Sequence, residues 1–325
     1  MIESPSPDPS TPLYSLLNGE GAGAMLAAAA GDVAGGASPV GYSALTQQAT
    51  VLAYHLMRYD RVERSALVDE WLELYTDHDS PNLYRSPSPA LSSFLEAARR
   101  GEAAATAEPS AEPAARVFPL GVWFRRRPQE LVEAAVAASR ATHLDAASVV
   151  AAAAVAGAVA ASCYAQGGRD LLAAAAEVGG TCLAAIEGEE STFSRLDRAR
   201  EWIEDLSTLP RVDQAPADTV SDLASRSGED VTRLPMAAIL ITSIFAGEPY
   251  RQIEQAAALG GSLLATMVGA MVGARAGIRS WPWVVPNDTW FAEIGRRLVS
   301  GNRETRDIPV PTHVEERLTM GDRAI

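Results

Sequence analysis

Aromatic side chains are scarce in this 325-residue chain, at 6% of all residues, although 47% of its residues are hydrophobic. Alanine and leucine carry most of the apolar content, which suits close packing of helices better than pleated strands. The composition therefore predicts an all-α protein. Two domains would fit the length, but helical enzymes of this size often have one core, and we expect a single domain.

Cysteine and basic residues are also few. The two cysteines, Cys163 and Cys182, both lie in Ala/Val-rich segments, where we expect buried, reduced thiols rather than a disulfide or a nucleophile. The 27 basic residues are outnumbered by 41 acidic ones, which gives a formal charge of −14, and the densest basic run is Arg125-Arg126-Arg127. Because this charge repels phosphate backbones, nucleic acid is not an expected partner.

A targeting segment is missing at the start. Residues 1–11 carry an acid and several prolines where a signal peptide has a basic and then an apolar stretch, so we expect a disordered tail. Residues 146–165 carry no charge, but they are rich in alanine and include Ser148 and Ser162. They predict a buried central helix rather than a membrane span, and we expect a cytoplasmic protein with no membrane partner.

The pattern of apolar residues predicts one helical domain over residues 12–301. A flexible insertion at about 102–113, a polar connection at about 208–230 and a polar C-terminal tail over 302–325 complete the organisation. A small-residue helix over Gly21–Ala30 is expected to end at the glycine-rich turn Gly31–Gly36. Further helices are expected from Ala44 onward and near 89–100, 128–142, 145–165, 168–187, 195–207, 235–247, 249–258, 261–276 and 288–299.

Four segments occur in an order that resembles the ADP-ribosylglycohydrolase family, whose all-helical enzymes remove ADP-ribose with the help of two divalent cations. The segments are Gly31-Asp32-Val33-Ala34-Gly35, Arg116-Val117-Phe118-Pro119-Leu120-Gly121, Thr142-His143-Leu144-Asp145, and the stretch from Gly260 to Gly277 with glycines at 269 and 273. Each segment is weak alone, and Ala111-Glu112 stands where the family usually has Asn-Gly. The resemblance implies a single, compact orthogonal helical bundle of the ADP-ribosylglycohydrolase type.

The departures from the family pattern concern its metal ligands. Thr46-Gln47-Gln48-Ala49 stands where active members have Thr-Asp-Asp-Thr, and Gly260-Gly261-Ser262-Leu263-Leu264-Ala265 stands where they have Gly-Gly-Asp-x-Asp-Thr. Magnesium and manganese need anionic oxygen ligands, and a pair of them concentrates four positive charges. Amides, a hydroxyl and an alkyl group cannot balance that charge, so we expect no metal and no other cofactor.

Several polar residues near these segments have an ordinary structural role as well as a functional one. Thr46 is expected to cap a helix, and Asp32 to accept hydrogen bonds from backbone amides in its turn. His143 fits a hydrogen-bonded residue at a helix junction. Asp32 and Asp145 are the catalytic candidates if any activity remains.

The ligand cleft of the family is expected to outlast the metal site. Its rim would be formed by the turn at 31–36, the loop over 76–89 and the Gly260-Gly261 pair, where backbone amides can hold phosphates. Within the loop, Arg85 could contact a phosphate and Tyr84 an adenine or ribose face. The ligand-binding candidates are Asp32, Thr46, Gln47, Gln48, Tyr84, Arg85, His143, Gly260, Gly261 and Ser262.

Three functions remain open on the sequence. The leading hypothesis is a catalytically degenerate member of the family, which binds an ADP-ribose-like ligand or a protein partner. The second is a metal-independent hydrolase of glycosidic bonds that uses other acids, such as Asp32, Asp77, Asp79 or Asp145, as a converging carboxylate pair. The third is a structural or regulatory subunit, for which a filled cleft and a large apolar surface patch would be the evidence.

Overall fold

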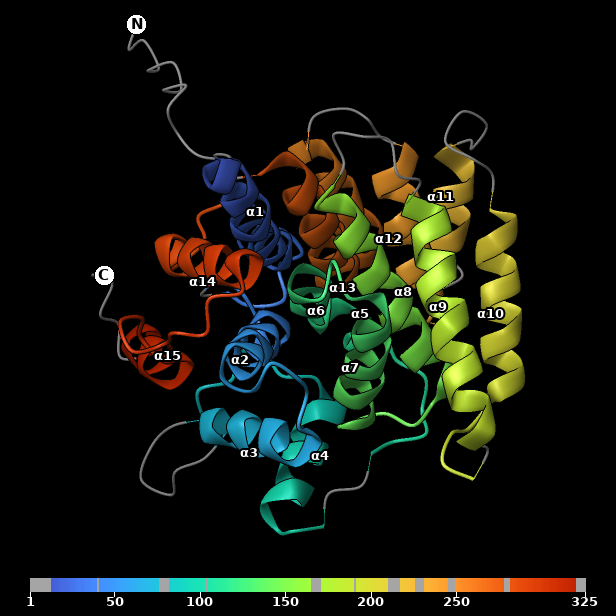
Figure 1. The fold of residues 1–325 in the computed structure, drawn as a ribbon, viewed down its shortest axis with the longest axis horizontal. Helices are drawn as coiled ribbons and strands as arrows, with labels where there is room; N and C mark the ends of the chain where they lie inside the picture. Colours follow the sequence, from blue (N-terminus) through green and yellow to red (C-terminus); the bar gives the residue numbers. More distant parts are fainter. Residues whose placement is uncertain are drawn as a thin grey trace, which may run out of the picture.

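The computed structural model describes residues 13–39, 41–75, 82–102, 105–164, 171–189, 191–209, 217–225, 231–244, 249–277 and 281–319. These residues form an all-α domain, as predicted, and within them extended segments meet only in isolated bridges such as that between Thr106 and His143 (Figure 1). The helices are α1 (Leu13–Ala34), α2 (Ala44–Tyr59), α3 (Arg64–Tyr75), α4 (Pro89–Arg99), α5 (Glu112–Arg116), α6 (Phe118–Trp123), α7 (Pro128–Arg140), α8 (Ala146–Ser162), α9 (Leu171–Ile186), α10 (Leu196–Thr208), α11 (Ala217–Ser225), α12 (Arg233–Ile244), α13 (Pro249–Ala276), α14 (Asp288–Ser300) and α15 (Pro311–Thr319).

Helices α1 and α13 pack so closely that only glycine fits at their contacts. A Cβ atom on Gly273 would lie 2.1 Å from the carbonyl oxygen of Gly23, and one on Gly269 would lie 2.1 Å from that of Ala27. Since such distances are far below van der Waals contact, a side chain at either position would push the helices apart. The glycine spacing near the C-terminal end of α13 is therefore explained by packing between helices.

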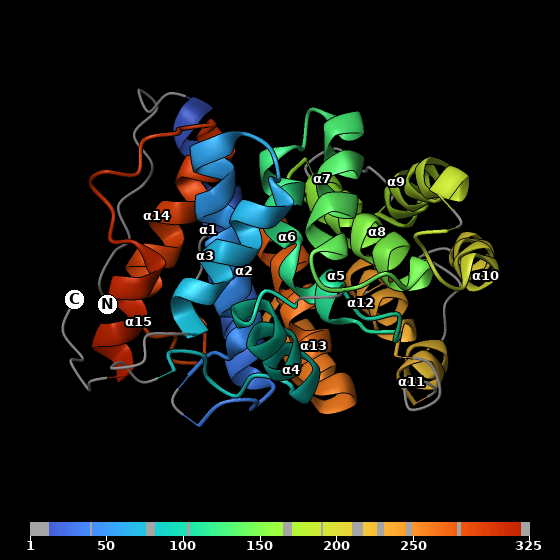
Figure 2. The ribbon, with the colours of Figure 1, turned by 90° about the horizontal axis from the view of Figure 1, so that it is seen from below.

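Helix α8 lies at the centre of the second half of the domain. All of its residues are buried, and it contacts α5, α6, α7, α9, α10, α12 and α13. The prediction of a buried central helix from residue 146 is thus confirmed. Figure 2 shows α9, α10 and α11 at one end of the molecule and α14 and α15 at the other. By length and composition alone, residues Leu171–Glu189 and helix α13 could cross a membrane, a property that buried core helices share.

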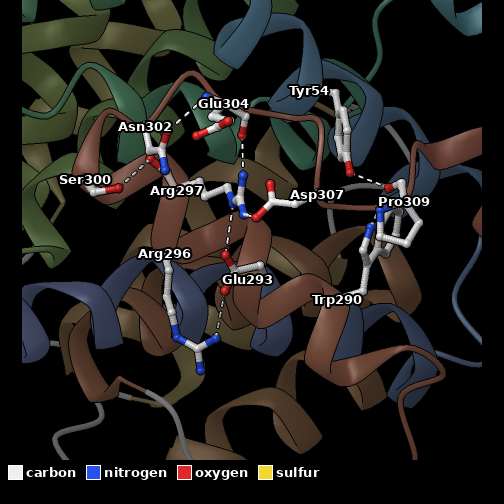
Figure 3. Close-up of polar contacts among 10 residues, drawn as sticks. All are labelled: Tyr54, Trp290, Glu293, Arg296, Arg297, Ser300, Asn302, Glu304, Asp307 and Pro309. Carbon is white, nitrogen blue, oxygen red and sulfur yellow. Dashed lines mark hydrogen bonds and ion pairs between the residues drawn. The ribbon is translucent and has the colours of Figure 1, made fainter. Parts of the chain in front are cut away.

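The segment after α14 is fastened to the domain by polar contacts (Figure 3). Arg297 donates to Asp307 at 2.8 Å and to the carbonyl oxygen of Glu304. Just before α15, the carbonyl oxygen of Pro309 accepts a hydrogen bond from Trp290 at 2.9 Å. The sequence predicted a polar tail here, but residues 302–319 lie against the domain and end in α15, which packs on α2 and α3.

Other element boundaries differ from the sequence expectation in instructive ways. Helix α1 does not end at Gly31 but continues to Ala34. Gly31 serves helix packing rather than a turn, since a Cβ there would lie 2.1 Å from the carbonyl oxygen of Ala265 in α13. The expected insertion at 102–113 includes a turn held to the domain, since Thr106 exchanges backbone hydrogen bonds with Thr142 and Leu144. The short helices α5, α6, α11 and α15 were not anticipated.

Candidate functional site

The carboxylate of Asp32 is buried where the end of α1, the start of α2 and the break in α13 meet. It accepts hydrogen bonds from the Ser43 amide at 2.8 Å, from the Ser43 hydroxyl at 2.9 Å and from the Thr46 hydroxyl at 2.7 Å. The hydroxyl of Ser262 is a further donor. Three segments that are distant in sequence thus converge on one acid, which is surrounded by neutral donors.

The local sequence explains how each segment reaches this point. Ser43, rather than Thr46, is the N-cap of α2, so the expectation that Thr46 caps this helix is wrong, and Thr46 uses its hydroxyl on Asp32 instead. Gly260 and Gly261 interrupt α13, and the φ of Gly261 is +61°, a left-handed conformation that glycine adopts without strain. The second half of α13 therefore begins at Ser262, beside Asp32.

Gln47 and Gln48, which the sequence comparison aligned with the family's first aspartate pair, bind other parts of the protein. Gln47 is buried, donates to the carbonyl oxygen of Leu83 at 2.8 Å and accepts from the amide of Arg85 at 2.8 Å. Gln48 is also buried, and its Oε1 accepts from Arg116 at 3.4 Å. The two amides thus fix the loop before α4 and the arginine of α5, which are structural duties.

This donor set does not suit a pair of divalent cations. Both carboxylate oxygens of Asp32 already accept hydrogen bonds, and Thr46 and Ser262 add only hydroxyls. Leu264, which the sequence resemblance places at the position of a family aspartate, is fully buried in the apolar core. Within the described ranges, no three His, Cys, Asp or Glu side chains come together as a metal site would require.

A pocket of about 240 Å³ lies next to Asp32, since it is lined by Ser43 and Ser262, two of the residues that donate to this carboxylate. Gly260 and Glu112 also border it, and Glu112 is only partly buried. A neighbouring pocket of about 270 Å³ shares Leu91 and Glu112 with the first. The remaining residues that line the second pocket are Ala90, Ser93, Phe94, Ala97, Glu102, Thr106, Arg116, Thr142 and His143.

Tyr84 and Arg85, expected as ligand contacts, are engaged elsewhere. The Tyr84 ring is buried and its hydroxyl donates to the carbonyl oxygen of Trp71 at 3.1 Å, so it has no face for a nucleotide. Arg85 forms an ion pair with Glu315 of α15, and its guanidinium carbon lies 4.2 Å from the ring centroid of Tyr42. Both residues help to hold α15 and the loop before α4, and neither lines the two neighbouring pockets.

His143 and Asp145 lie close in sequence but serve different sites. His143 is buried in the second pocket beside Thr142, whose hydroxyl lies 2.7 Å from its Nδ1. Burial, assisted by the charge of Arg116, lowers the pKa of His143 to about 3, so the imidazole is neutral at pH 7. Asp145 is the N-cap of α8, accepts from the amide of Ser148 at 2.8 Å and borders a separate pocket.

The two described carboxylates named for a metal-free reaction, Asp32 and Asp145, do not line one pocket. Asp32 contacts Ser43 and Ser262 of the first pocket, and Asp145 borders a third one, which shares no lining residue with the other two. Asp77 and Asp79 lie outside the described residues. Ser43, Glu112 and Arg116 are among the pocket residues that the sequence did not indicate, although Glu112 and Arg116 stood in segments that resemble the family.

Comparisons with known proteins bear on the family and the fold of this chain. The family model described as ADP-ribosylglycohydrolase matches residues 19–307. A solved structure described as "ADP-ribosylglycohydrolase-related protein complex" has 18% sequence identity and a TM-score of 0.57, and the match covers 88% of this chain and 99% of that one. No curated protein matches the chain.

Proposed function

The chain belongs to the ADP-ribosylglycohydrolase family, and on that premise we propose that it is a non-catalytic member that binds an ADP-ribose-type ligand without metal ions. The observation that carries this proposal is the state of Asp32. Its two oxygens are occupied by donors from Ser43, Thr46 and Ser262. A carboxylate so engaged is neither a free metal ligand nor a free general base, and the metal-dependent reaction of the family lacks its ligands.

Binding is supported by the space that remains. The pocket next to Asp32 keeps the glycine break of α13 and a rim that includes Ser43, Ser86, Ser88 and Ser262. Hydroxyls and backbone amides suit the sugar hydroxyls and phosphates of such a ligand. The charge of −14 favours a small ligand or a protein over nucleic acid, and a cytoplasmic location without membrane attachment remains part of the proposal.

Two alternatives stay within reach of experiment. Among the described residues, a metal-independent hydrolase would use Glu112, the carboxylate that borders both pockets, since Asp32 and Asp145 do not converge. A partner-binding subunit is the other alternative, because the similar solved structure is described as a protein complex. Against a purely structural role, the cleft is open, and the large apolar side chains exposed on the described surface are Tyr59, Val284 and Val310, from three separate segments.

The test is calorimetric titration of the full chain with ADP-ribose, once with excess magnesium and once with EDTA. Equal binding in both buffers is expected. The exposed residue Ala37 borders the pocket, so the Ala37→Trp variant should fill it and abolish binding, whereas Ala184→Trp on the exposed face of α9 should bind normally. Binding that requires magnesium, or no binding at all, would contradict the proposal.

Catalysis needs its own readout. Release of ADP-ribose from an ADP-ribosylated protein should remain at the uncatalysed rate in both buffers. Turnover that is lost in Glu112→Gln but kept in EDTA would replace the proposal with the metal-independent hydrolase.

A further inference from the structure

Arg116 is a buried cation without an ionic partner. Its side chain is 1% exposed, and it donates to Gln48 Oε1 at 3.4 Å and to the hydroxyl of Thr142. Its Nε has no hydrogen-bond partner, and within the described part of the chain it forms no ion pair. The ring of Trp71 lies 4.7 Å from the guanidinium carbon and offers its face, but a ring does not neutralise a charge.

The missing partner has a reason in the sequence. Gln48 stands where the family pattern has the second aspartate of Thr-Asp-Asp-Thr, and an aspartate there would face Arg116 with a negative charge. The amide cannot do so, and its own Nε2 is buried without a partner. Burial lowers the pKa of Arg116 to about 10, which still leaves the guanidinium charged at pH 7. The charge of Glu112 favours the charged guanidinium, but among the described residues no carboxylate lies at ion-pair distance. A buried charge that is compensated only in part is costly, so an anion that reaches it gains a strong contact.

The second pocket gives access to this cation. Arg116 borders it together with Thr142 and His143, and its lining also contains Leu91 and Phe94 of α4. The pocket therefore combines polar and apolar lining residues, which suits a ligand with an anionic head and an apolar body.

The hydrogen bonds around Thr142 add a second donor. Its hydroxyl accepts from Arg116 and lies 2.7 Å from His143 Nδ1. If the hydroxyl donates to Nδ1, the proton of the neutral imidazole resides on Nε2. His143, which lines the same pocket as Arg116, then has an N–H group to donate.

We propose that the pocket between α4 and α5 binds a small organic carboxylate with an apolar body, held by Arg116. Glu112 is the nearby carboxylate that limits this binding, because it borders the pocket and is only partly buried without reaching ion-pair distance of Arg116. Glu102 also borders the pocket, but it pairs with Arg100 at 2.8 Å. This site does not require the ADP-ribose site to function.

The experiment is a titration of the full chain with three probes of one shape and different charge: benzoate, benzamide and benzylamine. Saturable binding of benzoate is expected, at least tenfold tighter than that of the other two. Glu112→Gln should tighten benzoate binding severalfold by removing repulsion, whereas Glu133→Gln on the exposed face of α7 should leave it unchanged. Arg116→Gln should weaken it at least tenfold.

Because Arg116 is buried, its variant could lose the fold, and the Glu112 variant keeps the proposal open to refutation. Tightest binding of benzylamine, equal binding of benzamide and benzoate, or an unchanged benzoate affinity in Glu112→Gln would each overturn it. Ala37→Trp separates the two sites, since it should abolish ADP-ribose binding and leave benzoate binding intact.

Discussion

Ser262 donates a hydrogen bond to the carboxylate of Asp32, although 230 positions separate the two residues. The contact joins the glycine break of α13 to the last turn of α1 and brings together two of the segments that resemble the ADP-ribosylglycohydrolase family. At the position where the sequence resemblance implied a cation site, a hydroxyl donates to an acid. The carboxylate of Asp32 therefore connects α1 with the start of α2 and with the second half of α13.

Asp32→Asn should destabilise the protein by about 2–4 kcal/mol, since the amide group would face donors that now point at a carboxylate. The donors at risk are Ser43, Thr46 and Ser262. Denaturant unfolding measures the effect, and Asp69→Asn on the exposed face of α3 is the matched control. Equal stability of the two variants would show that Asp32 has no such role.

Two glycine-to-alanine changes should have opposite effects. Gly273→Ala places a methyl group 2.1 Å from the carbonyl oxygen of Gly23, which should cost about 1–3 kcal/mol or more through forced separation of α1 and α13. At Gly180 in α9 a Cβ would meet no atom within 4 Å, so Gly180→Ala should stabilise by about 0.5–1 kcal/mol. Thermal unfolding of both variants checks the prediction, which fails if the two melting temperatures shift in the same direction.

The buried ion pair between Arg85 and Glu315 should be sensitive to the loss of one partner. Burial raises the pKa of the Glu315 carboxyl, and Arg85 together with the hydroxyl of Tyr42 opposes this shift. Glu315→Ala leaves Arg85 without its counter-ion and should cost about 3–5 kcal/mol. Glu316→Ala, one position further along α15, should cost far less.

A double variant tests the origin of that loss. If the cost arises from an uncompensated buried charge, Arg85→Met combined with Glu315→Met should be more stable than Glu315→Ala alone. A double variant that is less stable would mean that the ion pair itself, rather than charge balance, stabilises α15. Urea unfolding curves with equal slopes would validate the comparison.

His143 should make the stability depend on pH between about 3 and 6.5. Burial and Arg116 lower its folded-state pKa to about 3, whereas an unfolded histidine titrates near the ordinary value of 6.5. Between these values the unfolded chain binds a proton that the folded chain does not, so stability is present above 6.5 and is lost as the pH falls, by about 1.4 kcal/mol per unit.

His143→Gln removes this contribution. The difference in stability between the wild-type protein and the variant should therefore be constant above pH 7 and should shrink steadily below pH 6. Unfolding by denaturant at half-unit pH steps gives the two curves, and parallel curves down to pH 4 would contradict the assignment of a buried neutral imidazole.

Local sequence determined most of the helices and the glycine break within α13. Runs of alanine predict α8 and α9, and the Gly260-Gly261 pair predicts the break that divides α13 into two segments. These features depend on neighbours within one or two turns, and backbone propensity and helix capping act over that distance. The absence of the four family aspartates could likewise be read directly from the sequence.

The partners of the polar residues were decided only by the tertiary structure. Arg85 was expected to meet a ligand, but the position of α15 gives it Glu315, 230 residues away. Tyr84 was expected at the rim of the ligand cleft but lies in the core. Arg116 was not expected at a site, but it lines the pocket between α4 and α5. A buried charge or hydroxyl takes whichever partner the packed helices bring within hydrogen-bond distance, and local sequence periodicity does not encode that distance.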